Sequence, residues 1–178
     1  RYNLKIKTMK KVFGILLFAA MFFMAQDGFA QSFKTGHINR DEIITSMPEY
    51  DTAMNKYNEF GQELTNALEL MQVELNNKYD QFTKEEKNLS ELVKANKVQE
   101  ITDMQTRMNN FQQQAQLQLQ EKQAELLNPI IEKANNAINA VAKEGGYIYI
   151  YDIRTLVYVD TVKSTDIGPL VRARLGIK

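Results

Sequence analysis

The feature that most constrains this chain is a stretch of 96 residues, 49–144, that contains one glycine (Gly61) and one proline (Pro129). Glycine and proline are the residues that most strongly interrupt helices, so their scarcity over such a length indicates helix. Helix would then far exceed the usual one-third of residues in a globular domain. We therefore expect a mainly α protein with a small β body built from the two ends.

Apolar residues recur along this stretch at steps of three and four, which is the spacing of one face of a helix. The first apolar stripe consists of Tyr57, Phe60, Leu64, Leu68, Met71, Leu75, Tyr79 and Phe82, and the second of Ile101, Met104, Met108, Phe111, Ala115 and Leu119. The other faces are polar, and 25 of the 96 residues are asparagine or glutamine. A single stripe on each of two polar helices predicts a coiled-coil pair.

The two stripes are separated by a polar segment, and the helix is expected to break near residues 88–90. Lys84 and Lys87 precede this point, where cations favour a helix C-terminus, and Ser90 can cap a new helix that begins at Glu91. Residues 49–144 are thus predicted to form a long helical hairpin with its turn near 88–90. One uninterrupted helix is the alternative.

The residues before the hairpin, 31–48, are predicted to form the first strand and a short helix of the body. Residues 33–39 have β character, and Asn39 with Glu42 three residues later forms a capping-box pattern. The segment 46–49, which contains Ser46 and Pro48, has the same pattern of a helix start and is expected to begin the long arm.

The residues after the hairpin, 145–178, are predicted to form a β-hairpin and a C-terminal helix. Gly145 and Gly146 end the arm, and two β-rich runs follow at 147–151 and 156–159. Asp166 is expected to cap a last short helix that carries Ile167, Leu170, Val171 and Leu175 on one face.

The predicted sheet is small and has apolar residues on both faces, so a single chain cannot bury all of these side chains. We therefore expect a homo-oligomer that assembles through the sheet. The residues predicted to form this assembly body are Ile148, Ile150, Leu156 and Tyr158.

The first thirty residues resemble an export signal. Lys10 and Lys11 precede a run of 14 uncharged, mostly apolar residues, 12–25, and the small residues Gly28 and Ala30 then precede Gln31. A membrane anchor, the alternative, needs about 20 apolar residues. Residues 1–30 are therefore expected to be upstream sequence and a cleaved signal peptide, which predicts export to the periplasm.

Composition excludes several classes of site. The chain has no cysteine and one histidine, so it can form neither a disulfide nor a thiolate or multi-histidine metal site. No phosphate loop, nucleophile elbow or paired-acid motif is present, and no basic patch suits nucleic acid. Removing residues 1–30 takes away five bases and one acid, which leaves 17 basic and 21 acidic residues and a net charge of −4. We expect no enzyme activity, no cofactor and no metal.

The end segments also resemble those of a known family, the Skp/OmpH periplasmic chaperones. The similarity covers residues 34–177, and the segments that carry it are 36–39 (GHIN), 43–50 (IITSMPEY), 141–147 (VAKEGGY), 156–158 (LVY) and 166–167 (DI). The resemblance implies a trimer in which a β-barrel body carries three helical hairpins around a cavity. It further implies that the cavity holds unfolded outer-membrane proteins without ATP until delivery to the barrel-assembly machinery.

The best-known members of that family are basic, whereas this mature chain is acidic. We therefore do not expect a lipopolysaccharide-binding site in this chain from the resemblance. Unbranched, polarisable methionines suit contacts with varied partners, and Met54, Met71, Met104 and Met108 are the candidate client contacts. The same stripe can instead be the contact between the two helices of the hairpin. A structural spacer or scaffold of the cell envelope is the alternative function.

Overall fold

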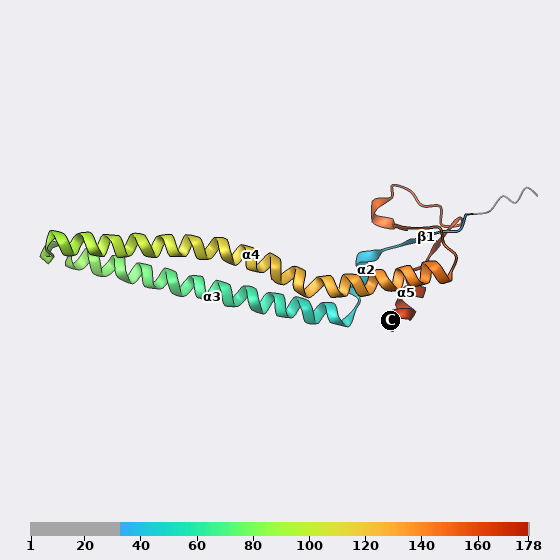
Figure 1. Ribbon diagram of the computed structural model, residues 1–178, viewed down its shortest axis with the longest axis horizontal. Coiled ribbons are helices and arrows are strands. Elements are labelled where there is room, and N and C mark those ends of the chain that lie inside the picture. Colours follow the sequence, from blue (N-terminus) through green and yellow to red (C-terminus); the bar gives the residue numbers. More distant parts are fainter. Residues whose placement is uncertain (1–32, 178) are drawn as a thin grey trace, which may run out of the picture. The chain divides into compact units, whose positions relative to one another are not determined.

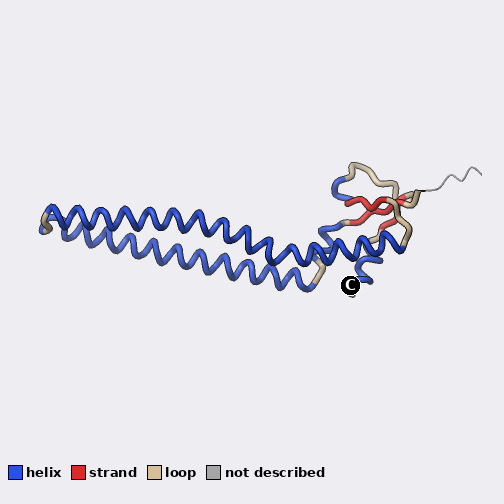
Figure 2. Tube along the Cα trace, viewed as in Figure 1, coloured by secondary structure: helices blue, strands red, loops and turns tan. Residues whose placement is uncertain are grey.

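The computed structural model describes residues 33–177, so the predicted signal peptide lies outside the described residues. Residues Lys34–Lys178 form one compact unit. This unit is mainly helical, as predicted, with a small sheet at the end where residues from both ends of the unit meet (Figure 2). None of the helices within residues 33–177 has the length and hydrophobicity needed to cross a membrane.

The long helical stretch is an antiparallel hairpin rather than one helix. Helix α3 spans Pro48–Glu85, a 3₁₀ turn occupies Glu86–Asn88, and helix α4 spans Glu91–Glu144. The two helices lie side by side along the arm (Figure 1). Ser90 caps α4 as predicted, because its Oγ accepts a hydrogen bond from the backbone N–H of Val93 at 3.4 Å.

Glycine ends the returning helix, also as predicted. Gly145 is the C-cap of α4, and Gly146 adopts a φ of +67°, a left-handed conformation that other residues rarely adopt. The chain is thereby turned back toward the first strand, where the N–H of Ile148 donates to the carbonyl oxygen of Lys34 at 2.9 Å.

The sheet has three parallel strands in the order β2-β1-β3. Strand β1 spans Thr35–Ile38, β2 spans Tyr149–Asp152 and β3 spans Ser164–Asp166. The predicted β-hairpin is wrong: residues 156–159 do not form a strand, and β2 and β3 both pair with β1 instead of with each other. The physical reason is that β propensity favours an extended backbone but does not specify which segment, if any, pairs with it.

Two short helices complete the body. Helix α2, Arg40–Thr45, is capped by Asn39, whose Oδ1 accepts from the N–H of Glu42 at 3.3 Å, as predicted. Ser46 does not cap α3: its hydroxyl donates back to the carbonyl oxygen of Glu42 at 2.7 Å, and α3 begins at Pro48 without a side-chain cap.

Helix α5 spans Gly168–Leu175, and its N-cap is Ile167 without a side-chain cap, so Asp166, the predicted cap, lies one residue earlier at the end of β3. The Oδ1 of Asp166 accepts from the N–H of Gly168 at 2.8 Å. Of the residues predicted to share one face of this helix, Ile167 and Val171 are fully buried, whereas Leu170 is 52% exposed.

The core lies where α2, α4 and α5 pack on one another and on the sheet. Its buried residues are Ile38, Ile43, Ile44, Met47, Ala53, Ile130, Ala134, Ala137, Val141, Ile167 and Val171. The single histidine, His37, is buried too, and its Nδ1 lies 2.9 Å from the Oγ of Ser164 on the neighbouring strand. The sheet is open in this chain, so a closed barrel and a trimeric body stay predictions.

Candidate functional site

The arm is held together by a seam, meaning the line of apolar residues along which α3 and α4 face each other. Ala53 and Ile130 are buried at the base of this seam, and Ile101 and Met104 are buried in its outer part. The remaining stripe residues are half-buried, except Tyr79, which is 59% exposed. Two helices without a third thus leave a strip of apolar surface partly open to solvent along the arm.

The four candidate methionines do not share one environment. Met104 is 2% exposed and lies in the seam, whereas Met54, Met71 and Met108 are half-buried. The three half-buried side chains can be contacted from outside without opening the hairpin. Met104 can contact a client only after α3 and α4 separate locally.

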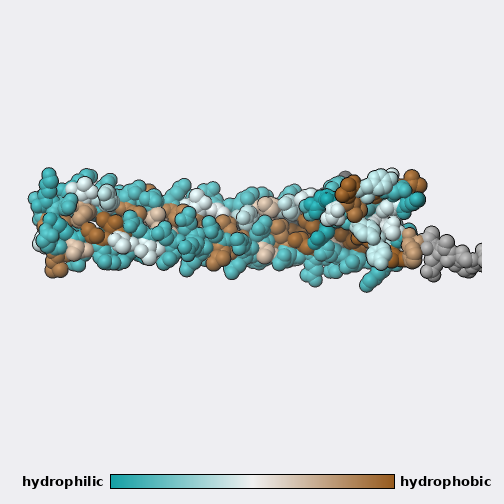
Figure 3. All heavy atoms as spheres, turned by 90° about the horizontal axis from the view of Figure 1, so that it is seen from above, coloured by the Kyte–Doolittle hydropathy of each residue, from teal (hydrophilic) through white to brown (hydrophobic). Residues whose placement is uncertain are grey.

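Large apolar residues outside the two stripes are also exposed to solvent. These residues on the arm are Leu70, Val73, Leu92, Val93, Val98 and Leu117. Leu70 and Leu92 are the most exposed, at 72% and 74%. Most of this set lies between residues 70 and 98, in the outer part of the hairpin next to the turn, and Figure 3 shows hydrophobic residues between hydrophilic ones along the face in view. A sequence signal existed, because an apolar residue on the polar face of an amphipathic helix breaks the pattern.

Ion pairs join the two helices across the seam. Lys78 Nζ lies 3.1 Å from a carboxylate oxygen of Glu100, and Lys97 Nζ lies 3.4 Å from one of Glu85. Exposed pairs of this kind contribute up to about 1 kcal/mol each. They therefore set the register of the hairpin more than they stabilise it.

A third pair ties the start of α3 to α4 near the body. The side chain of Lys133 donates a hydrogen bond to the carboxylate of Glu49, which lowers the pKa of Glu49 from its ordinary 4.5. This contact stands beside a cavity of about 330 Å³ whose lining includes Pro129 and Ile130. The base of the arm is thus fixed by charge as well as by apolar packing.

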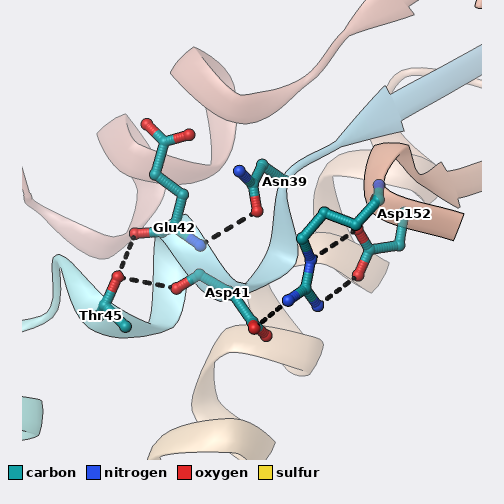
Figure 4. A network of polar contacts seen from close by, with 6 residues as sticks. Asn39, Asp41, Glu42, Thr45 and Asp152 are labelled. Atoms are coloured by element: carbon teal, nitrogen blue, oxygen red, sulfur yellow. Dashed lines mark hydrogen bonds and ion pairs between the residues drawn. The ribbon is translucent and has the colours of Figure 1, made fainter.

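The body contains a polar network that fixes the segment after β2 (Figure 4). Arg154 donates to both carboxylate oxygens of Asp152 and also pairs with Asp41 on α2. The hydrogen bonds from Arg154 lower the pKa of Asp152, and the same bonds raise the pKa of Arg154. Residues far apart in sequence are thereby joined at the carboxyl end of β2.

The other aspartates of the body have local structural roles. Asp160 Oδ1 accepts from the N–H groups of Val162 and Lys163, and Asp166 holds the start of α5. Nowhere in residues 33–177 do His, Asp and Glu side chains gather into a group that could hold a metal ion. The carboxylates therefore support turns and helix ends.

The predicted assembly residues lie on a body surface that is largely open in this chain. Ile148 is 50% exposed and Tyr158 is 80% exposed, whereas Ile150 and Leu156 are half-buried. Further apolar side chains close to them in sequence are exposed as well: Tyr149, Tyr151, Val157 and Val162. A surface of this composition is typical of a protein interface.

A comparison with protein families matches residues 34–175 to the model of one family, described as outer membrane protein (OmpH-like). The match spans both the hairpin arm and the body. A comparison with curated proteins gives no significant match.

Proposed function

We propose that this chain, which belongs to the OmpH-like family, is an ATP-independent holdase. Members of that family are periplasmic chaperones of outer-membrane proteins and not enzymes. In this proposal it binds unfolded outer-membrane β-barrel proteins between helical arms and prevents their aggregation before membrane insertion. Delivery to the barrel-assembly machinery is part of the same proposal.

The observation that carries the proposal is the apolar surface left open along the arm. A spacer that only sets a distance is best served by a closed seam and polar outer faces. Here the seam is half-buried over most of its length, and Leu70 and Leu92 lie in solvent outside it. A strand of an unfolded barrel protein alternates apolar and polar residues, so it suits a shallow surface on which apolar and polar groups alternate.

Weak contacts of this kind need to be numerous. Each exposed side chain of the arm would contribute little alone, but several arms around one client raise the effective concentration of every contact. This requirement favours assembly of several chains, and we propose a homotrimer built through the body. The exposed apolar residues around β2, among them Ile148 and Tyr158, support that part of the proposal.

Charge has a small role in this account. With the predicted signal peptide removed, the net charge is −4, so long-range attraction of acidic clients is not available. Client capture would then depend on apolar contact, and its strength should change little with salt concentration.

The direct test is aggregation of a client. A urea-unfolded outer-membrane barrel protein is diluted into buffer with and without the purified chain from residue 31 onward, in the absence of ATP, and light scattering is followed. We expect scattering to be suppressed at stoichiometric amounts of assembled chaperone. Aggregation that proceeds equally fast with the protein present would contradict the proposal.

A further inference from the structure

A pocket of about 330 Å³ lies at the base of the arm, where α3 begins and runs beside α4 (Figure 1). Its apolar walls come from both helices: Ala53 of α3, and Leu126, Pro129 and Ile130 of α4. Ala53 and Ile130 are buried, whereas Pro129 is exposed. A pocket of this volume is at the lower end of the range of ligand sites, so it suits a single side chain of a larger partner.

Two residues leave the walls of this pocket apolar and its space unfilled. Pro129 lies inside α4 and has no backbone N–H, so its ring lines the pocket without adding a hydrogen-bond donor. Ala53, on the other helix, carries only a methyl group. A flat apolar ring is therefore the kind of group that this space accommodates.

The polar groups around the pocket are engaged with one another, except for one lysine. Lys133 binds Glu49, and the hydroxyl of Thr52 donates to the carbonyl oxygen of Pro48 at 3.4 Å. Lys56 lines the same pocket, and within residues 33–177 its side chain forms neither an ion pair nor a hydrogen bond. Two lysines and one glutamate give the rim a net charge of +1, although the predicted mature chain carries −4. The pocket thus combines an apolar surface with a cation that is left for a carboxylate.

We propose that this pocket binds an aromatic side chain of an unfolded barrel protein, and that Lys56 binds an acidic side chain two residues away in the same client segment. Membrane barrels carry aromatic residues at both ends of the apolar band of their strands, where the polar loops begin. The ammonium group of Lys56 can also contact the face of the aromatic ring, which adds to the attraction. The inference rests on the proposed holdase function and names a client feature that the holdase prefers.

The spacing of this client feature follows from the geometry of a helix and a strand. Ala53 and Lys56 lie on one face of α3, about 4.5 Å apart along its axis. In an extended client, residues i and i+2 point to the same side and lie about 6.6 Å apart. The flexible four-carbon side chain of lysine spans the difference of about 2 Å. An acid directly next to the aromatic residue would point away from Lys56 instead.

Labelled peptides test this preference on the purified chain from residue 31 onward. Three peptides of equal length carry Phe-x-Asp, Phe-x-Lys or Ser-x-Asp at their centre, and fluorescence anisotropy gives their dissociation constants. Phe-x-Asp should bind at least about 10-fold more tightly than Ser-x-Asp, because the ring is removed from water. It should bind about 5-fold more tightly than Phe-x-Lys, which is the effect of one exposed charge pair.

Variants of the chain locate the effect at this pocket. Lys56→Glu should invert the charge preference, so that Phe-x-Lys binds more tightly than Phe-x-Asp. Thr52→Leu adds apolar bulk at the pocket and should reduce the advantage of Phe-x-Asp over Ser-x-Asp. Arg107→Glu is the matched control, because Arg107 is an exposed cation on the same arm and also forms no ion pair within residues 33–177. This control should keep the wild-type order of the three peptides.

The outcomes separate this inference from the proposed function. Equal binding of the three peptides by the wild type would overturn the inference, and so would a preference for Phe-x-Asp that survives Lys56→Glu. Inversion by Arg107→Glu as well would assign the preference to overall charge and would also overturn it. In each of these cases the proposed function stands if the same protein suppresses aggregation of the unfolded barrel protein. A chain that binds no peptide and suppresses no aggregation would contradict the proposed function, and the inference with it.

Discussion

A Cβ atom placed on Gly36 of β1 would lie 2.8 Å from Cδ1 of Ile150 on the adjacent strand β2. The same atom would lie 3.1 Å from Cγ2 of Ile167 and 3.2 Å from the carbonyl oxygen of Thr165. Glycine therefore fits the observed spacing between the strands and the start of α5, whereas a Cβ would require Ile150 Cδ1 to move and Ile167 and the Thr165 carbonyl to shift slightly. The sheet that carries the proposed assembly surface depends on this one residue.

Gly36→Ala should destabilise the body by about 1–3 kcal/mol, because the added methyl group overpacks a site closed on three sides. Gly61→Ala is the matched control: its Cβ would meet only Leu119 Cδ2 at 3.7 Å, and alanine favours helix over glycine. The control should gain about 0.5–1 kcal/mol. Thermal unfolding followed by circular dichroism compares the two, and an equal effect of both substitutions would refute the packing argument.

Met104 and Met108 should separate arm stability from client binding. Met104 is buried in the seam, so Met104→Ala should cost about 2 kcal/mol or more and speed hydrogen exchange in the neighbouring turns of α3 and α4. Met108→Ser changes a half-buried side chain, and we expect it to weaken client retention with a smaller loss of stability. Unchanged client affinity in Met108→Ser would assign this residue to the seam alone.

The exposed leucines near the hairpin turn should act on clients without supporting the fold. Leu70→Ser combined with Leu92→Ser should leave the free energy of unfolding within about 0.5 kcal/mol, because neither side chain is buried. The same pair should shorten the lifetime of the complex with an unfolded barrel protein, measured by fluorescence of a labelled client. Gln113→Ser, at an exposed polar position, serves as the control. A complex as long-lived as that of the wild type would exclude these leucines as contacts.

The contact between Glu49 and Lys133 predicts a loss of stability in acid. The hydrogen bond from Lys133 lowers the pKa of Glu49 below its ordinary 4.5, so the contact contributes stability above pH 4.5. That contribution is lost as the pH falls through the lowered pKa of the folded state. Because both side chains are exposed, the effect is small, and it is read as a difference from Glu49→Gln. The melting temperature of the wild type should fall more steeply than that of Glu49→Gln as the pH is lowered below 4.5; parallel curves would contradict the assignment.

Sequence patterns predicted the hairpin well because its signals are local. The polar segment between the stripes, the capping serine at position 90 and the glycines at 145–146 each act within a turn or two of their own position. The same applies to Asn39 at the start of α2. Hydrogen bonds made within four residues can be anticipated without knowing the rest of the fold.

The sheet could not be predicted in the same way, because its contacts join residues more than a hundred positions apart. Strand β3, Ser164–Asp166, is short and polar and carries no β signal, yet it pairs with β1. Residues 156–159 carry a strong β signal but pair with no strand within residues 33–177. The exposed Leu70, Leu92 and Leu117 fall outside the regular stripes, so the spacing of the stripes does not predict them.

We propose that several copies of this chain together hold one unfolded outer-membrane protein. The most direct measurement is the mass of the assembly, by native mass spectrometry, with and without an unfolded barrel protein. We expect a trimer without the client, and a trimer with one client bound after the client is added. A monomer in both samples, or a trimer that takes up no client, would contradict it.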